Sequence, residues 1–320
     1  MKEQNYPFFH EKVSITQLRS EFVVDLMNDY TLASSGVLKH GLSVRILQAT
    51  KLAPQATKLI AYHNEEKRTI GFLSLEENTN WLYSIKYVFV DPNYRKMGLA
   101  TRLLKYAMIL AKEKGAKKVN LNVYLTDTKT INLYKKLGFI IFGTTLLGQG
   151  HLPGFAPFRL IKQTTAGVAY LSKLTTIKQG KLFKLKTNSR KNREMLFDIY
   201  QRCIDKKWID FYEINSNNLQ NGSRHVWRPP FFKDVLINDS TNAFALIFSS
   251  PFLQKATVEL YSTSDEVSLS ILENLLKILT NRGISFTQIT LFNIHKNVTL
   301  NWFQEKAMRT FQFASMGKTL

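Results

Sequence analysis

Apolar and polar residues of the first half follow patterns that predict a mixed α and β fold. Helices are predicted where apolar residues recur every three or four positions, over residues 17–30, 31–39, 98–114 and 128–137. Strands are predicted where β-branched and aromatic residues cluster, over residues 12–16, 58–63, 69–76, 81–90, 118–125, 139–147 and 158–163. The Gly- and Pro-rich residues 148–157 predict a loop. This order is typical of an α+β fold with a mixed central sheet flanked by helices.

The second half repeats this pattern. Its predicted strands are residues 181–186, 243–248, 256–262 and 288–294, and its predicted helices are residues 190–204, 269–279 and 300–306. Gly115 and Gly283 each end a predicted helix 168 positions apart, and Tyr134 and Phe303 lie 169 positions apart. Two units in one register indicate a duplicated domain. We therefore predict two tandem domains, residues 1–164 and 165–320.

The amino-acid composition excludes several classes of protein. The 320 residues are 44% hydrophobic and 12% aromatic, which excludes a disordered chain. The single cysteine, Cys203, excludes an internal disulfide framework and fits a reducing compartment. The N-terminal residues lack an apolar stretch of signal-peptide length, and no segment is long and apolar enough to span a membrane. These features predict a soluble cytoplasmic protein without a membrane partner.

The chain carries a formal charge of +20, which favours anionic partners such as nucleic acid, acidic proteins or phosphorylated cofactors. The charge is divided equally, with +10 on each side of residue 160, so it is not a basic tail. The six histidines have neither the spacing nor the cysteine pairs of a metal site, and we predict no metal. Residues 221–233 interleave basic and aromatic side chains, which fits either RNA contact or an ordered loop.

Residues 87–101 (YVFVDPNYRKMGLAT) carry the clearest chemical pattern: a strand, a tight turn and a helix start with small residues at Gly98 and Ala100. Free amide groups at a helix start bind anions, and small residues let a diphosphate approach the backbone. Arg95 and Lys96 add positive charge beside this turn. A second interpretation fits equally well, in which Gly98 and Ala100 only permit close packing of the helix on its strand.

Two motifs in this half resemble the GNAT superfamily of N-acetyltransferases. Residues 90–100 (VDPNYRKMGLA) are similar to the family's V-x-P-x-Y-R-x-x-G-x-G/A signature, and residues 133–139 (LYKKLGF) are similar to its L-Y-x-K-L-G-F segment. The detailed resemblance covers residues 81–143, and the predicted topology extends it to residues 12–163. The resemblance implies a GNAT fold and acetyl-CoA as cosubstrate.

The resemblance also implies roles for particular residues. A backbone amide near Phe89 or Val90 would stabilise the thioester oxyanion, and Tyr134 would protonate the departing coenzyme A thiolate. Alternatively, the ring of Tyr134 could have a packing role alone, on one turn of its amphipathic helix. The backbone of the turn would bind the diphosphate through Arg95, Lys96, Met97, Gly98, Leu99, Ala100 and Thr101.

Several positions depart from the family pattern. Asp127 stands where the family commonly has Asn, so it either contacts the pantetheine arm or caps the helix that follows. The strand over residues 81–90 holds Ser84 where the family often has an acidic base, and it has no carboxylate. Glu76 or Glu77 on the neighbouring strand, or a water chain, could deprotonate the acceptor amine, although these two residues also read as an exposed acidic turn.

The second half lacks the matching chemistry. Asp265 and Glu266 occupy its phosphate turn, where no glycine is present, and Phe303 replaces the tyrosine. This half is therefore predicted to be a degenerate copy without a cofactor.

The sequence predicts an acetyl-CoA-dependent N-acetyltransferase that transfers an acetyl group directly to a primary amine in a ternary complex. The acceptor could be a small molecule, a protein amine or an RNA-linked group. Two other functions remain open: a non-catalytic module that binds acetyl-CoA, and a nucleic-acid-binding protein driven by the positive charge.

Overall fold

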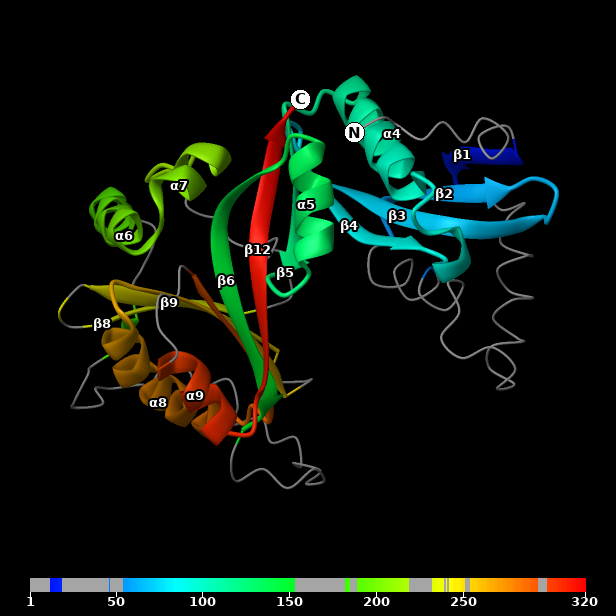
Figure 1. Cartoon of the computed structure of the whole chain (residues 1–320). Helices are drawn as coiled ribbons and strands as arrows, with labels where there is room; N and C mark the ends of the chain where they lie inside the picture. Colours follow the sequence, from blue (N-terminus) through cyan, green and yellow to red (C-terminus); the bar gives the residue numbers. More distant parts are fainter. Residues whose placement is uncertain are drawn as a thin grey trace. The chain divides into compact units, whose positions relative to one another are not determined.

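The structure is a computed structural model, and it describes residues 12–18, 46, 54–152, 182–184, 189–218, 232–238, 240, 242–250, 254–292 and 298–320. The chain forms two compact units (Figure 1). Unit 1 comprises Met1–Val123, Asp127–Ile140 and Met316–Leu320, and unit 2 comprises Tyr124–Thr126 and Ile141–Ser315. Several predictions lie outside the described residues: the helices beyond residue 18, the strand over 158–163, the boundary at 164 and the segment 221–231.

The sheet of unit 1 confirms the strands predicted over residues 12–16, 58–63, 69–76, 81–90 and 118–125. Its strands run in the order β1-β2-β3-β4-β5, with bounds Val13–Gln17, Thr57–His63, Arg68–Thr79, Leu82–Val90 and Lys118–Tyr124. Strands β1 to β4 pair antiparallel, whereas β4 and β5 pair parallel. A parallel pair needs a crossover, and helix α4 (Leu99–Glu113) provides it. Helix α5 (Thr128–Lys136) then follows β5.

Helix α4 packs closely on the sheet of unit 1. Its apolar side chains, including Leu103, Leu104, Ala107 and Ala111, are fully buried, as the apolar periodicity predicts. Gly71 on β3 permits this approach, because a Cβ atom at Gly71 would lie 3.0 Å from the Leu103 side chain. The packed helix fixes the position of its own N-terminus at the end of β4.

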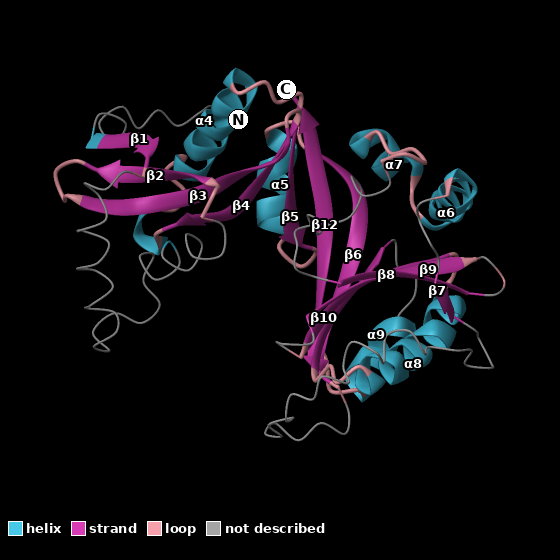
Figure 2. Ribbon diagram, turned by 180° about the vertical axis from the view of Figure 1, so that it is seen from behind, coloured by secondary structure: helices cyan, strands magenta, loops and turns pink. Residues whose placement is uncertain are grey.

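The sheet of unit 2 has the strand order β12-β6-β11-β10-β9-β8-β7. The bounds in chain order are β6 Ile140–His151, β7 Leu182–Lys184, β8 Phe232–Asn238, β9 Ala243–Ser250, β10 Lys255–Ser262, β11 Phe286–Phe292 and β12 Arg309–Thr319. The helices are α6 Arg190–Cys203, α7 Lys206–Tyr212, α8 Asp265–Asn281 and α9 Val298–Glu305. Figures 1 and 2 show α6 and α7 on one face of this sheet and α8 and α9 on the other.

The two faces of this sheet bury different side chains. The α8–α9 face holds an aliphatic core that includes Ile271, Leu275 and Leu279 of α8. The α6–α7 face holds stacked aromatic rings; the centroids of Tyr261 and Phe292 lie 4.7 Å apart. Aromatic pairs in such offset geometry add stability beyond the area that they bury.

Strand β6 corrects the loop predicted over residues 148–157. The loop predicted from Gly148 is wrong for residues 148–151, because β6 continues to His151 and pairs antiparallel with β11. A Cβ atom at Gly148 would lie 2.4 Å from the Phe303 ring, so this glycine makes room for a packed aromatic side chain. From Ile141 onward this strand belongs to unit 2.

The sequence analysis also missed three elements, α7, β8 and β12. A signal for α7 was present, because the Asp205 carboxylate caps the helix by accepting a hydrogen bond from the Lys207 amide at 2.8 Å. Among the described residues, no helix combines the length and apolar composition needed to span a membrane.

The order of elements confirms the duplication. Unit 1 and the strand after it follow β4-α4-β5-α5-β6, and the second half follows β10-α8-β11-α9-β12. In both series the first two strands pair parallel. Gly115 and Gly283 therefore occupy equivalent helix ends, and both glycines have positive φ there.

Candidate active site

Within the part of unit 1 that the structure describes, strands β4 and β5 pair only at their beginnings. Leu82, Tyr83 and Ser84 pair with Lys118, Val119 and Asn120. On its other side β4 contains a bulge, since its register with β3 shifts between Phe72 and Ser74 and Tyr87 has a φ of 54°. A bulge bends its strand and increases its twist. The later part of β4 therefore has backbone groups available to a ligand that lies between the two strands.

The turn after β4 leads into an uncapped helix N-terminus. Gly98 is the N-cap residue of α4, with a φ of 79° and no side-chain hydrogen bond to the helix. The first helical bond joins the Arg102 amide to the Gly98 carbonyl at 3.0 Å, so the amides of the first turn have no partner within the helix. No acidic residue occurs in that turn. These features make the start of α4 suitable for an anion.

The structure does not support the packing interpretation of Gly98. A Cβ atom at this position would meet no atom within 4 Å, so close packing does not require the glycine. The left-handed backbone does require it, because a side chain strains this conformation. The open space beside Gly98 is what a ligand at the turn would need.

Two basic side chains lie beside the turn. The Arg95 Nε donates a hydrogen bond to the Val90 carbonyl at 3.1 Å, and its guanidinium lies 5.7 Å from the Phe89 ring centroid. Lys96 is exposed and has a φ of 65°, so the turn holds two left-handed residues close together. The positive charges and the free helix amides thus occupy the same end of β4.

Tyr134 and Asp127 lie together on α5. Tyr134 is 5% exposed, and burial, together with the nearby Asp127 carboxylate, raises its pKa to about 12. Its hydroxyl has no hydrogen-bond partner among the described residues. Asp127 accepts hydrogen bonds from the Thr130 amide at 3.0 Å and the Thr130 hydroxyl at 2.7 Å. Asp127 therefore caps α5, which is one of the two roles predicted for it.

The topology brings the starts of α4 and α5 to one edge of the sheet. Both helices follow the carboxyl ends of the parallel strands β4 and β5. Carboxyl ends of parallel strands share an edge, which is where ligands of such sheets commonly bind. Phe89, Val90 and residues 95–101 thus gather at one turn, and Tyr134 lies on the helix that begins at the same edge.

The candidate bases are engaged with other groups. Glu76 forms an ion pair with Lys86, and Glu77 accepts a hydrogen bond from the Tyr83 hydroxyl at 2.9 Å. Both residues lie on strand β3, so the expectation of an exposed acidic turn is wrong. Ser84 is buried and donates a hydrogen bond to Asn120 on β5. Sequence reasoning missed Asn120, because only strand pairing brings it beside Ser84.

The equivalent region of unit 2 is closed. Strands β10 and β11 pair from Lys255–Leu260 with Phe286–Leu291, without the early separation seen in unit 1. Ser264 caps α8 by accepting a hydrogen bond from the Val267 amide at 3.3 Å, and Asp265 and Glu266 fill the first turn. Phe303 is completely buried. Carboxylates at this helix start would repel an anion.

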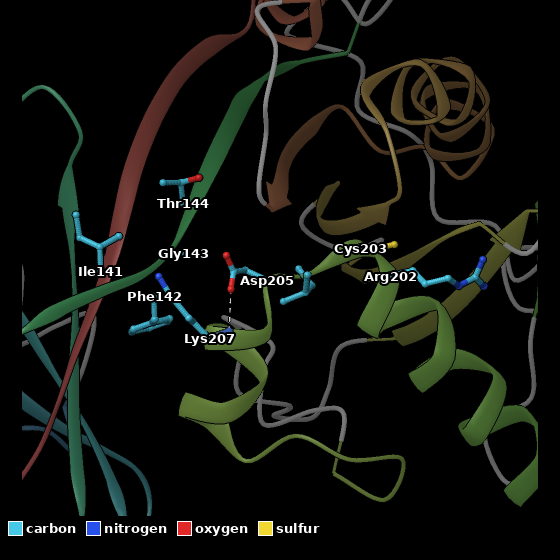
Figure 3. A pocket seen from close by; sticks show the side chains of 9 residues that line it. Ile141, Phe142, Gly143, Thr144, Arg202, Cys203, Asp205 and Lys207 are labelled. Carbon is cyan, nitrogen blue, oxygen red and sulfur yellow. Dashed lines mark hydrogen bonds between the residues drawn. The ribbon is translucent and has the colours of Figure 1, made fainter.

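A cavity of about 460 Å³ lies elsewhere in unit 2, beside the junction of α6 and α7 (Figure 3). It is lined by Ile141, Phe142, Gly143, Thr144, Arg202, Cys203, Ile204, Asp205 and Lys207. None of the predicted site residues lines it. Burial raises the pKa of the Cys203 thiol to about 12, so the thiol is not a reactive nucleophile at neutral pH. Asp205 caps α7, and Arg202 pairs with Asp198 at 3.2 Å, so these charges have structural partners.

Comparison with known proteins finds matches to part of the chain. Residues 23–139 match the acetyltransferase (GNAT) family. An uncharacterized N-acetyltransferase of Methanocaldococcus jannaschii is 32% identical over 80 residues, which is 22% of this chain and 34% of that protein. The match therefore spans about a third of that relative's length.

Solved structures resemble larger parts of the chain. A GCN5-related N-acetyltransferase from Sphaerobacter thermophilus aligns over 97% of this chain and 96% of its own, with 10% identity and a TM-score of 0.54. A GNAT family acetyltransferase from Elizabethkingia anophelis with acetyl-CoA bound covers 42% of this chain and 80% of its own, with 20% identity and a TM-score of 0.33. At such low identity, the first of these similarities shows the fold alone.

Proposed function

Because the chain has a GNAT fold and its residues 23–139 match the acetyltransferase (GNAT) family, we propose that it is an acetyl-CoA-dependent N-acetyltransferase. One observation carries this proposal. The uncapped N-terminus of α4, with left-handed Gly98 and open space above it, lies at the end of a strand that separates from its parallel neighbour. A diphosphate with an extended thioester arm fits this combination of an anion site and open strand edges.

The turn after β4 would hold the cosubstrate. The amides of Leu99, Ala100 and Thr101 and the positive end of the helix dipole would bind the diphosphate, and Arg95 and Lys96 would add charge. Met97 lies between these charges and Gly98, so its backbone belongs to the same turn. The pantetheine arm would run along β4, where backbone groups beyond Ser84 are available.

We assign the oxyanion donor to Val90 in preference to Phe89. The Asp91 amide donates to the Ile70 carbonyl of β3 at 2.9 Å. Successive amides of an extended strand point to opposite sides, so the Val90 amide points away from β3, toward the β5 side. There it could donate to the thioester oxygen, which becomes negative as the amine attacks.

Tyr134 would act as the general acid. Its pKa of about 12 keeps the phenol protonated at neutral pH, so a proton is available when the carbon–sulfur bond breaks. An ordinary thiol has a pKa near 8.5, so complete transfer is unfavourable unless the tyrosinate regains a proton. The acceptor nitrogen loses a proton when the amide forms and can supply it. Asp127 would hold the start of α5 in place through its bonds to Thr130.

Acetyl transfer would proceed by direct attack of the acceptor amine. Cys203 has a raised pKa, and no covalent nucleophile accompanies the turn among the described residues. Glu76 and Glu77 are already paired, so we propose that the amine loses its proton to water. The acceptor is a primary amine of a small molecule or a protein. A panel of small-molecule and protein amines would test this, with turnover detected as the release of the free thiol of coenzyme A. Binding of acetyl-CoA without turnover on any amine would instead favour a non-catalytic module.

Acetyl-CoA is expected to bind at one site per chain, in unit 1. Replacing Ala100 by Glu should weaken the affinity more than about tenfold, because a carboxylate in the first turn of α4 repels the diphosphate. Glutamate is favourable at a helix start, so the fold should persist. Isothermal titration calorimetry measures both the number of acetyl-CoA sites per chain and the affinity. Ala100→Gln is the matched neutral control and should bind more tightly than Ala100→Glu; two sites per chain would show that unit 2 also binds.

The pH dependence of turnover follows from the pKa of Tyr134. Below pH 12 this acid stays protonated, so the rate should rise with pH as the acceptor amine loses its proton, with no decline up to about pH 10. A steady-state profile with saturating acetyl-CoA tests this expectation. A falling limb at pH 8 to 9 would identify a different acid with a lower pKa.

A further inference from the structure

Six lysines gather at the edge of unit 1 opposite the turn of residues 95–101. We call this group the lysine edge; it comprises Lys112, Lys114, Lys117, Lys135, Lys136 and Lys318. Lys112 and Lys114 lie at the C-terminal end of α4, Lys117 follows this helix, and Lys135 and Lys136 end α5. Figures 1 and 2 both show the ends of α4 and α5 beside the C-terminus of the chain.

Hydrogen bonds hold these segments together. The Lys318 Nζ donates to the Leu137 carbonyl at 2.7 Å, directly after α5. The Leu320 amide donates to the Lys117 carbonyl at 2.9 Å, so the end of the chain lies along the start of β5. The lysine edge is therefore built from residues distant in sequence, on a surface whose backbone is ordered by tertiary bonds.

The charge at this edge is poorly balanced. Lys112, Lys114, Lys117, Lys135 and Lys136 are exposed, and none of these five pairs with a carboxylate among the described residues. Glu113 is the acidic residue within the same stretch of α4. Lysine near a helix C-terminus complements the helix dipole, which accounts for one or two such residues at each helix. Six lysines from three segments exceed that need.

We propose that the lysine edge binds the phosphate backbone of a nucleic acid. Exposed lysines attract phosphates without reading bases, so the binding would be independent of sequence and strongly dependent on salt. Two large exposed apolar side chains lie near the edge in sequence, Ile109 one turn before Lys112 and Ile140 shortly after α5, which is less than the apolar face that an interfacial helix inserts into a membrane. The inference concerns a second site and does not depend on the proposed acetyl transfer.

The lysine edge and the cofactor turn of residues 95–101 lie at opposite ends of α4. Residues 95–101 lead into the start of this helix, whereas Lys112 and Lys114 lie at its end. An α-helix rises about 1.5 Å per residue, so the two sites are separated by roughly 20 Å. Acetyl-CoA and nucleic acid should therefore bind without competition.

Fluorescence anisotropy with a labelled single-stranded RNA of about 20 nucleotides, and with a DNA duplex of similar length, tests the proposal. The variant Lys117→Gln/Lys135→Gln/Lys136→Gln removes three charges from the edge. The control Lys191→Gln/Lys206→Gln/Lys277→Gln removes three exposed charges from helices of unit 2. Each protein is titrated over about 50 to 200 mM salt.

We expect the wild-type chain to bind with micromolar affinity that falls steeply with salt. The edge variant should bind RNA about tenfold or more weakly, with a salt slope reduced by about 2, because each lost phosphate contact removes about 0.7 from the slope on a single strand. The control should match the wild type, and saturating acetyl-CoA should displace no RNA. A second edge variant, Lys112→Gln/Lys114→Gln, should reduce the slope by about 1.4.

Other results would overturn the proposal. Undetectable or salt-insensitive binding would exclude a phosphate site, and equal losses in the edge variant and the control would show that net charge alone attracts RNA. Displacement by acetyl-CoA would place the RNA in the cofactor turn. Binding to vesicles of anionic phosphatidylserine in place of RNA would identify the edge as a membrane-contact surface. Chemical denaturation of the edge variant with urea verifies that it is folded.

Discussion

Replacing Tyr134 by phenylalanine is expected to lower turnover by about 10²- to 10⁴-fold, the usual contribution of a positioned general acid. The substitution removes the one hydroxyl and keeps the buried ring, whose centroid lies 5.9 Å from that of Phe139. The affinity for acetyl-CoA should change little, because the diphosphate would bind at the start of α4. Steady-state kinetics on an identified amine, together with calorimetry, separates the two effects.

Tyr83 offers a matched control. It is also a buried tyrosine with a raised pKa, caused by burial and by its hydrogen bond to Glu77. Tyr83→Phe should leave turnover nearly unchanged, since its hydroxyl is bound to a carboxylate of β3. Unchanged turnover in Tyr134→Phe would remove this residue from the mechanism. Equal losses in both variants would indicate a structural effect of losing a buried hydroxyl.

The largest expected effect on stability concerns Asp234 of β8. Asp234 is 4% exposed. Its carboxylate forms one ion pair with the buried Arg282 at 2.7 Å and another with the exposed Lys184. Asp234→Ala would leave the Arg282 guanidinium buried without its counter-charge, which costs about 3–5 kcal/mol in the free energy of unfolding. Chemical denaturation with urea measures this change.

Two further variants identify the cause of that loss. Lys184→Ala removes only the exposed partner and should cost less than about 1 kcal/mol, as surface ion pairs do. The double variant Asp234→Leu/Arg282→Met removes both buried charges and should recover much of the stability lost in Asp234→Ala. A double variant as unstable as Asp234→Ala would show that shape, and not the unpaired charge, dominates.

The local elements of unit 1 could be predicted from the sequence. The apolar spacing of α4, the alternation around the turn at residues 64–67 and the capping residue Asp127 depend on neighbours within a few positions. The turn at Gly98 was equally local, because a left-handed residue followed by a helix start is encoded by consecutive residues. These signals were sufficient to locate the candidate cofactor turn and the tyrosine of α5.

The tertiary structure decided what depends on distant partners. Gly148 resembles a loop residue until Phe303, 155 positions later, fills the space above it. The separation of β4 from β5, and its absence between β10 and β11, follows from strand register, which no single segment encodes. The lysine edge likewise exists only because Lys318 returns to the end of α5. The sequence alone thus determined the elements and their chemical motifs, whereas long-range pairing and packing decided which strand joined which unit and where a ligand could enter.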